Sequence, residues 1–189
     1  MQRDLVVRAQ RGDHDAFTAL VAGAVQQLYA TARLILRRDE LAEDAVQEAL
    51  VKAWTAIRGL RDPDRFDAWV YRLLVHACYR AARGERSRGA SEVPELPNDS
   101  FLAPDLHRDP QHTLADRDQL ERGFRRLSPN QRAVLVAHFY LDLSDAEAAE
   151  VLDIPTGTLK SRLNRATTAL RAALEADERQ AGLTTESIA

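Results

Sequence analysis

One stretch of the chain carries cations without any acid and has side chains suited to reading DNA. Residues 154–174 contain no Asp or Glu, and if Leu159 and Leu163 face a core, the polar residues on the opposite face of the helix point to solvent. These outward residues are Lys160, Ser161, Asn164 and Arg165. Arg and Asn match guanine and adenine edges in the major groove, while Lys and Ser bind phosphates or bases. We interpret this face as a DNA-reading surface; the alternative is a solvated polar face of a helical hairpin.

The elements that must position this face form a helix-turn-helix pattern. Ser144 and Glu147 have the spacing of a capping box, which predicts a short helix ending near Leu152. Asp153 stands at the turn, where Asp is one of the few non-glycine residues that tolerate a left-handed conformation. Small Ala149 lets the two helices cross closely. A short helix, a tight turn and a longer basic helix together predict a helix-turn-helix.

A second candidate surface lies in the first half of the chain, where aromatic residues and arginines occur together. They are Trp54, Phe66, Trp69, Tyr71 and Tyr79, with Arg58, Arg61, Arg65, Arg72 and Arg80. Such side chains stack on unpaired bases, at about 1–3 kcal/mol per base. Helical periodicity favours an ordinary core position for Phe66 and Trp69. The loop 59–65 and the outward residues Arg72, His76 and Tyr79 are the better candidates for nucleic acid, with core packing left open as the alternative.

The acidic run 39–48 places Glu40, Asp44 and Glu48 on one helical face. Carboxylates at this spacing could hold a metal, yet the chain contains no Glu-x-x-His motif, and like charges repel by a few tenths of a kcal/mol per pair. We therefore expect no metal and no cofactor. From the residues alone a solvated face is favoured, and a protein-docking face is the alternative.

The composition predicts an all-α protein. Among 189 residues there are only 8 Gly and 7 Pro, while Ala, Leu, Arg and Glu, which lose little rotamer freedom in a helix, are abundant. The single cysteine, Cys78, cannot form an internal disulfide, which suits a reducing cytoplasm. No run of about 18 apolar residues predicts a membrane span, and no signal peptide is evident. The absence of a phosphate-binding loop or a nucleophile motif predicts that the chain is not an enzyme.

Charge and proline content divide the chain. The net charge of -3 combines +2 over residues 1–83, -4 over residues 84–116 and -1 over residues 117–189. We predict a helical domain at 1–83, an acidic linker at 84–112, a helix-turn-helix domain at 113–175 and a tail at 176–189. A linker of this length spans up to about 90–100 Å when extended, so nothing forces the two domains to touch.

Caps and apolar stripes predict the helices of both domains. In the first domain a short helix at 3–10 precedes a helix that starts at the Asp13 cap and runs to Ile35. Further helices follow at 40–59 and from the Asp62–Pro63 pair onward. In the second domain helices are expected at 113–126 and at 129–140, the latter with Ser128 and Gln131 as a capping box.

Both domains carry motifs of a known family. Residues 44–48 (DAVQE), the pair Ala53–Trp54 and residues 65–72 (RFDAWVYR) resemble the second conserved region of bacterial RNA polymerase sigma factors of the extracytoplasmic-function class. Residues 128–135 and 154–166 resemble the fourth region of the same proteins. A lone helix-turn-helix is common among regulators, whereas both blocks in this order around an acidic linker are specific. The chain departs from the family at Asp142 and Asp153, where glycine is frequent.

The resemblance implies partners and contact residues. In the family the DAVQE helix docks on the clamp helices of the polymerase largest subunit, which implies Asp44, Gln47 and Glu48 as polymerase contacts. The following loop and helix capture flipped bases of the minus-ten element. The residues implied there are Arg61, Arg65, Arg72, His76, Tyr79 and Arg80. The fourth region reads the minus-thirty-five duplex and touches the polymerase flap. The residues implied there are Thr158, Lys160, Ser161, Asn164 and Arg165.

We therefore expect a sigma factor that binds core RNA polymerase, recognises minus-ten and minus-thirty-five promoter elements and directs transcription initiation. Family members are commonly held inactive by an anti-sigma factor, and the acidic linker would thread the polymerase interior, where its charge imitates nucleic acid. A stand-alone helix-turn-helix regulator that never engages polymerase is the runner-up. A small helical enzyme with a carboxylate site is the third alternative.

Overall fold

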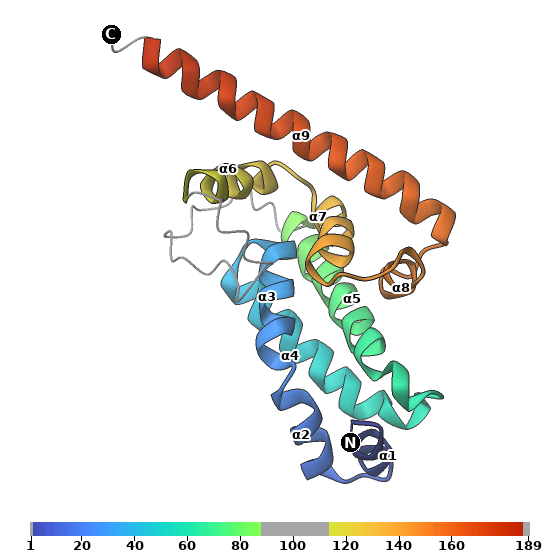
Figure 1. Ribbon diagram of the computed structural model, residues 1–189. Helices are drawn as coiled ribbons and strands as arrows, with labels where there is room; N and C mark the ends of the chain where they lie inside the picture. Colours follow the sequence, from blue (N-terminus) through green and yellow to red (C-terminus); the bar gives the residue numbers. More distant parts are fainter. Residues whose placement is uncertain (1, 88–113, 187–189) are drawn as a thin grey trace.

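The computed structural model describes residues 2–87 and 114–186, and every regular element within these ranges is a helix (Figure 1). The predicted all-α class is confirmed. The first group of helices comprises α1 (Gln2–Gln10), α2 (His14–Ala22), α3 (Val25–Leu36), α4 (Asp39–Ala56) and α5 (Phe66–Ser87). Two 3-10 turns, Ile57–Gly59 and Pro63–Arg65, connect α4 to α5. Because α5 continues to Ser87, the first domain extends past the predicted boundary at residue 83, and most of the predicted linker lies outside the described residues.

The single helix expected from Asp13 to Ile35 is wrong at its middle. Asp13 does cap α2, since its side chain accepts from the Ala16 N–H at 3.0 Å. At Gly23 the helix ends, and the Ala24 N–H donates to the Val21 carbonyl at 2.9 Å instead of continuing the α-helical ladder. Glycine weakens a helix interior, so the chain bends here. Helices α2 and α3 both face one core, and for this reason the helical spacing of apolar residues continues across the bend.

Among the described residues no single helix is long and apolar enough to cross a membrane. The pair α2 and α3 passes that test by length and composition together, but the two helices meet at 56°. Their large apolar side chains, including Phe17, Leu28 and Ile35, are buried in the protein. The pair is therefore core, as packed helices of a folded domain are.

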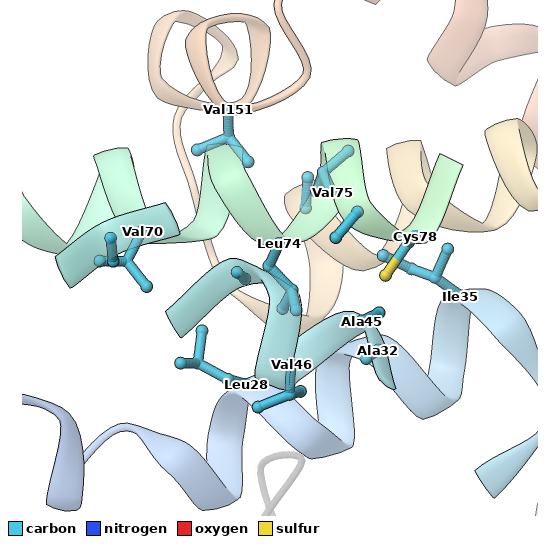
Figure 2. Close-up of a cluster of buried hydrophobic side chains, with 14 of the residues drawn as sticks. Leu28, Ala32, Ile35, Ala45, Val46, Val70, Leu74, Val75, Cys78 and Val151 are labelled. Carbon is cyan, nitrogen blue, oxygen red and sulfur yellow. The ribbon is translucent and has the colours of Figure 1, made fainter. Parts of the chain in front are cut away.

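The core of the first group lies between α3, α4 and α5 (Figure 2). Leu28 and Ile35 of α3 and Leu74 of α5 are fully buried, and burying one such side chain stabilises a fold by about 1.5–3 kcal/mol. Small residues line α4 toward its neighbours and let the helices approach closely: Ala42, Ala45, Ala49 and Ala53. Cys78 is fully buried, and burial raises the pKa of its thiol to about 12. The thiol therefore stays neutral and packs as a small apolar side chain.

The second group comprises α6 (Leu114–Arg125), α7 (Pro129–Leu135), α8 (Asp145–Val151) and α9 (Thr156–Glu186). Both predicted capping boxes form: Ser128 with Gln131, and Ser144 with Glu147. The helix expected at 129–140 changes to a π-helical turn over Val136–Tyr140, and Phe139 within this turn is 60% exposed. Local cap motifs thus located the helix starts, while the change of helix type within one apolar run left no sequence signal.

The helix α9 is longer than the predicted domain boundary at residue 175 allows. It continues to Glu186 through most of the segment expected to be a tail. Asp177, in that segment, accepts from the Arg122 Nε at 2.8 Å and pairs with Arg126, which ties α9 to α6 and the residues after it. On α6, Gly123 faces Leu174 so closely that a Cβ atom there would lie 2.8 Å from a leucine methyl carbon.

The two groups pack against each other, although the linker length does not require it. Helix α7 lies on α3, and α8 lies on α5, so that one buried apolar cluster contains residues of both groups (Figures 1 and 2). Val151 of α8 is fully buried beside α5. Arg132 of α7, 6% exposed, donates from Nε to the Ile35 carbonyl at 2.6 Å and from Nη1 to the Leu127 carbonyl at 2.6 Å. The chain is one packed unit over the described residues.

Candidate nucleic-acid interface

The helix-turn-helix has the geometry that its residues predict. Asp153 adopts the left-handed conformation at φ 55°, and the Ile154 N–H donates to the Ala149 carbonyl at 3.0 Å to close the turn. Ala149 is 3% exposed where α8 crosses α9, and Leu159 is fully buried beneath. The turn therefore fixes α9 relative to α8 and sets which of its side chains face outward.

The outward face of α9 carries the predicted duplex-reading residues. Lys160, Ser161, Asn164 and Arg165 are all exposed, while Thr158 is half-buried. The Ser161 Oγ donates to the Thr158 carbonyl at 2.9 Å, which fixes the hydroxyl against the first turn of the helix. Two hydrogen-bonding side chains and two cations thus lie at the start of the second helix, the part that contacts base edges in helix-turn-helix proteins.

The loop before α5 is held in place by α1. The Gln10 Nε2 donates to the carbonyls of Ile57 at 3.2 Å and Leu60 at 2.7 Å, and the Asp62 carboxylate caps the next turn by accepting from the Asp64 N–H at 3.1 Å. Arg61 is exposed in this loop. The loop therefore presents a cation on a backbone that is tied to the first helix.

Four of the predicted single-strand contacts follow one face of α5 and the turn before it: Arg65, Arg72, His76 and Arg80. Arg65 and Arg80 are exposed, and Arg72 and His76 are half-buried. Tyr79, predicted to point outward, differs: its hydroxyl is buried, and no described residue forms a hydrogen bond with it. Burial raises the pKa of the Tyr79 hydroxyl to about 12, partly offset by the Arg162 guanidinium on α9.

The cations on α5 already have partners in the helix-turn-helix. Arg65 pairs with Glu150 of α8, and the Arg72 Nη2 donates to the Asp153 Oδ1 at 2.7 Å. The other Asp153 oxygen lies 3.7 Å from the His76 Nε2. Burial lowers the pKa of His76 below its ordinary value, although Asp153 acts in the opposite direction, so the neutral ring is favoured near pH 7. The face expected to bind one strand of DNA is thus turned toward α8.

The predicted docking face on α4 separates into exposed and internally paired residues. Asp44 and Gln47 are exposed, whereas Glu48 is half-buried and pairs with Lys52 at 3.0 Å and with the Arg80 Nη2 at 2.7 Å. Burial opposes the ionisation of Glu48, but the hydrogen bonds from Lys52 and Arg80 outweigh it, and its pKa lies below the ordinary value. Arg80, a predicted DNA contact, is therefore held by a predicted polymerase contact.

Sequence reasoning missed an apolar groove next to Gln47. Val25, Tyr29, Val46, Leu50 and Val51 line it together with Glu43 and Gln47. Val51 is 58% exposed and Val25 is 38% exposed, so this apolar surface meets solvent in the free chain. Val51 stands four positions after Gln47 on the same helical face, and that spacing is the signal that could have identified it. Within the described ranges no three His, Cys, Asp or Glu side chains gather as a metal site would require.

The chain is similar to known proteins over most of its length. Residues 20–88 match the Sigma-70 region 2 family, and residues 117–170 match the Sigma-70 region 4 family. The ECF RNA polymerase sigma factor SigM of Mycobacterium tuberculosis is 32% identical over 164 residues, covering 86% of this chain and 79% of the relative. The chain belongs to the extracytoplasmic-function (ECF) family of RNA polymerase sigma factors.

Further relatives agree with this membership. The ECF RNA polymerase sigma-E factor of Escherichia coli is 31% identical over 176 residues, covering 88% of this sigma factor and 90% of the relative. Among solved structures, CnrH in complex with the cytosolic domain of CnrY has a TM-score of 0.62 and 28% identity over 93% of this chain and 98% of that one. RpoE of Bartonella quintana in complex with NepR, at a TM-score of 0.64 and 23% identity over 85% and 98%, supports the fold alone.

Membership decides between the alternatives left open by the residues. The region 2 match covers α3, α4 and α5, which a stand-alone helix-turn-helix regulator has no need of, and the family consists of transcription initiation factors and not of enzymes. The predicted resemblance is confirmed in both blocks and in their order. This sigma factor directs core RNA polymerase to promoters and so initiates transcription at them.

Proposed function

We propose that the sigma factor divides its task among three surfaces: α4 for polymerase, α5 with its preceding loop for the melted minus-ten strand, and the start of α9 for the minus-thirty-five duplex. The observation that supports this proposal is the presence of regions 2 and 4 in one chain, each with an exposed polar face of the required chemistry. Promoter opening by such a protein needs binding energy alone and forms no covalent bond.

The proposed polymerase contacts are Asp44, Gln47 and Glu48. Asp44 is exposed on α4, and Glu43 and Gln47 border the apolar groove, so this face suits a partner that offers basic and apolar side chains. Replacing Asp44 and Gln47 by Ala should weaken binding to core polymerase while the circular dichroism spectrum stays unchanged. Unaltered binding would assign docking to another face.

The proposed minus-ten contacts are Arg61, Arg65, Arg72, His76, Tyr79 and Arg80. Their guanidinium groups and aromatic rings can stack on bases that have left the duplex, and flipped bases need such platforms. The Tyr79 hydroxyl is buried in the free chain, so it must become exposed before it can contact a base. The proposed minus-thirty-five contacts are Thr158, Lys160, Ser161, Asn164 and Arg165, with Arg165 and Asn164 as base readers.

We also propose a protein inhibitor and a cytoplasmic location. CnrH was solved with the cytosolic domain of CnrY, and RpoE of B. quintana was solved with the anti-sigma factor NepR, so proteins with this fold bind dedicated partners. A partner of the anti-sigma class would bind the same apolar and acidic surface of α4, or part of the second group. Polymerase could then not bind that surface. The cytoplasm is where polymerase and promoter DNA are found.

Run-off transcription tests the proposal as a whole. Purified core polymerase is incubated with a library of genomic DNA fragments, once with the chain and once without it, and the start sites of the transcripts are mapped. Start sites that appear only with the chain, and that share two elements at fixed spacing, support the proposal. Duplex binding without any dependent transcript would refute the assignment of α4 and α5 to polymerase and melted strand.

A further inference from the structure

Helix α1 lies along the loop that joins α4 to α5. The region 2 family match starts at residue 20, so α1 stands outside the part of the chain that the match covers. The helix contacts both 3-10 turns of the loop, Ile57–Gly59 and Pro63–Arg65. The family match therefore leaves the task of α1 open, and its contacts with the loop are what can define that task.

Three residues on one face of α1 carry these contacts. Arg3, Val6 and Gln10 follow the i, i+3, i+7 spacing that places side chains on one side of a helix. Val6, in the middle, is fully buried and belongs to the core cluster of the first group. Burial of Val6 fixes the helix against the domain, so that Arg3 and Gln10 reach two different ends of the loop.

The amide of Gln10 holds the first end of the loop. Its Nε2 carries two N–H groups and donates to the carbonyls of Ile57 at 3.2 Å and Leu60 at 2.7 Å. These carbonyls belong to the turn that ends α4, and the last carbonyls of a helix have no partner within the helix. Because Gln10 is half-buried, it sets the direction in which the backbone leaves α4.

Two side chains at the start of α1 hold the second end of the loop. The Arg3 Nη1 donates to the Asp64 Oδ2 at 2.6 Å, and the Gln2 Nε2 donates to the Asp67 Oδ1 at 2.7 Å on the first turn of α5. Exposed Arg61 lies between the two held ends, in the loop that we assign to the minus-ten strand. The position of this cation therefore depends on α1.

We propose that Gln10 is a positioning residue for minus-ten recognition, which holds the loop in the conformation that receives an unpaired base and touches no nucleotide itself. A loop that is ordered before binding loses less conformational entropy when it binds, so its affinity rises without a new contact. The consequence for DNA rests on the proposed minus-ten role of the loop. The order of the loop in the free chain does not rest on that role.

Hydrogen exchange of the full-length chain, followed by mass spectrometry, tests the hold of Gln10 on the loop. The amides of Leu60 and Arg65 are hydrogen-bonded within the loop and report its opening. Gln10→Met keeps the length of the side chain and removes both N–H groups. It should speed exchange in residues 58–65 by about two- to tenfold, the range for one net hydrogen bond, and leave exchange in α9 unchanged.

Two variants serve as controls for Gln10→Met. Gln26→Met makes the same chemical change at an exposed position of α3 and should leave exchange in the loop unchanged. Gln10→His retains a ring N–H at the same number of bonds from Cα, and it should restore part of the protection. If Gln10→Met and Gln26→Met give equal exchange in residues 58–65, the positioning role is overturned.

A charge reversal keeps the test decisive if Gln10→Met does not fold. The side chains of Arg3 and Asp64 are 62% and 59% exposed, so their replacement does not disturb the core. Arg3→Asp should speed exchange at Arg65 by up to about fivefold, and adding Asp64→Arg should slow it again. Unchanged exchange at Arg65 in Arg3→Asp would then show that α1 does not hold the loop.

Strand binding by the holoenzyme separates this proposal from the proposed function. The probe is a fluorescent single strand with the non-template minus-ten sequence of a promoter mapped by run-off transcription. Gln10→Met should weaken its binding by about two- to tenfold at unchanged affinity for core polymerase, and Arg61→Ala should weaken it as well. If Arg61→Ala binds the strand like the wild-type chain, the minus-ten assignment of the loop fails and the hold measured by exchange stands. If Arg61→Ala weakens binding and Gln10→Met does not, the positioning role of Gln10 is refuted.

Discussion

Replacing Arg132 by Met should be among the most damaging single changes outside the apolar core. The guanidinium is 6% exposed and donates at 2.6 Å to the carbonyls of both Ile35 and Leu127. Met keeps most of the stem volume but leaves both buried acceptors without this donor. An unsatisfied buried acceptor costs about 1–3 kcal/mol, so the free energy of unfolding should fall by about 2–6 kcal/mol.

Urea unfolding followed by circular dichroism measures this loss. For a chain of this size a change of 1 kcal/mol lowers the melting temperature by about 2–4 °C, so thermal melts should show a fall of roughly 4–24 °C. Arg3→Met is the matched control, because the Arg3 side chain is 62% exposed and pairs with an Asp64 side chain that is 59% exposed, and such surface pairs contribute about 0–1 kcal/mol. Equal losses in the two variants would refute the reasoning, because they would mean that water reaches the Ile35 carbonyl and that α7 does not stay docked on α3.

Three further predictions can be checked with the free chain or its promoter complex. Cys78 should react with a thiol reagent at pH 8 only as fast as the fold opens, because burial raises its pKa to about 12; rapid labelling of the native chain, timed against a denatured sample, would contradict this. Ser144→Ala removes the acceptor of a capping box and should lower the free energy of unfolding by about 0.5–2 kcal/mol in a denaturant titration, with no change expected for exposed Thr168→Ala. Arg165→Ala should weaken promoter binding by about 1–3 kcal/mol and relax preference at one base pair, as measured on a set of substituted duplexes; a uniform loss on all duplexes would make Arg165 a phosphate contact.

The parts of the fold that the sequence predicted are those decided within a few residues of the chain. Ser144 and Glu147 lie three positions apart, and their mutual hydrogen bonds form whatever the rest of the protein does. The left-handed turn at Asp153 is likewise a local matter of which residues tolerate positive φ. The exposure of Lys160 and Arg165 follows from the burial of Leu159 by helical geometry alone.

The contacts between the two groups could not be predicted in the same way. Arg132 and the carbonyl of Ile35 are separated by 97 residues, and Arg65 and Glu150 by 85. Nothing at either position marks its partner, since a backbone carbonyl has no residue identity and an exposed arginine has many available acids. The sequence carries one coarse signal: residues 68–83 contain three arginines and no acid, and residues 142–153 contain five acids and no base. These two stretches face each other in the structure through the pair of Arg72 and Asp153.

Tyr79 shows how a face can be predicted correctly and its environment wrongly. Its place on α5 puts it near Arg72 and His76, as the helical period required. Helix α8 lies on α5 in the free chain, and the Arg162 guanidinium of α9 acts on the pKa of the Tyr79 hydroxyl, so the second group reaches the surroundings of this side chain. Periodicity describes one helix and its own core, so it cannot report a second domain that docks on the outer side.

The contacts between the two groups of helices differ in strength. The ion pairs of Arg65 and Arg72 are 36–52% exposed at their side chains, so each contributes little and is weakened by salt. The buried parts, Val151 and Arg132, supply most of the stability but have no affinity for DNA. A polyanion alone therefore competes only for the weak component, and release of the strong component needs a partner that binds both groups apart. Melted promoter DNA alone does not meet that requirement, because it offers nothing to replace the buried contacts of Val151 and Arg132.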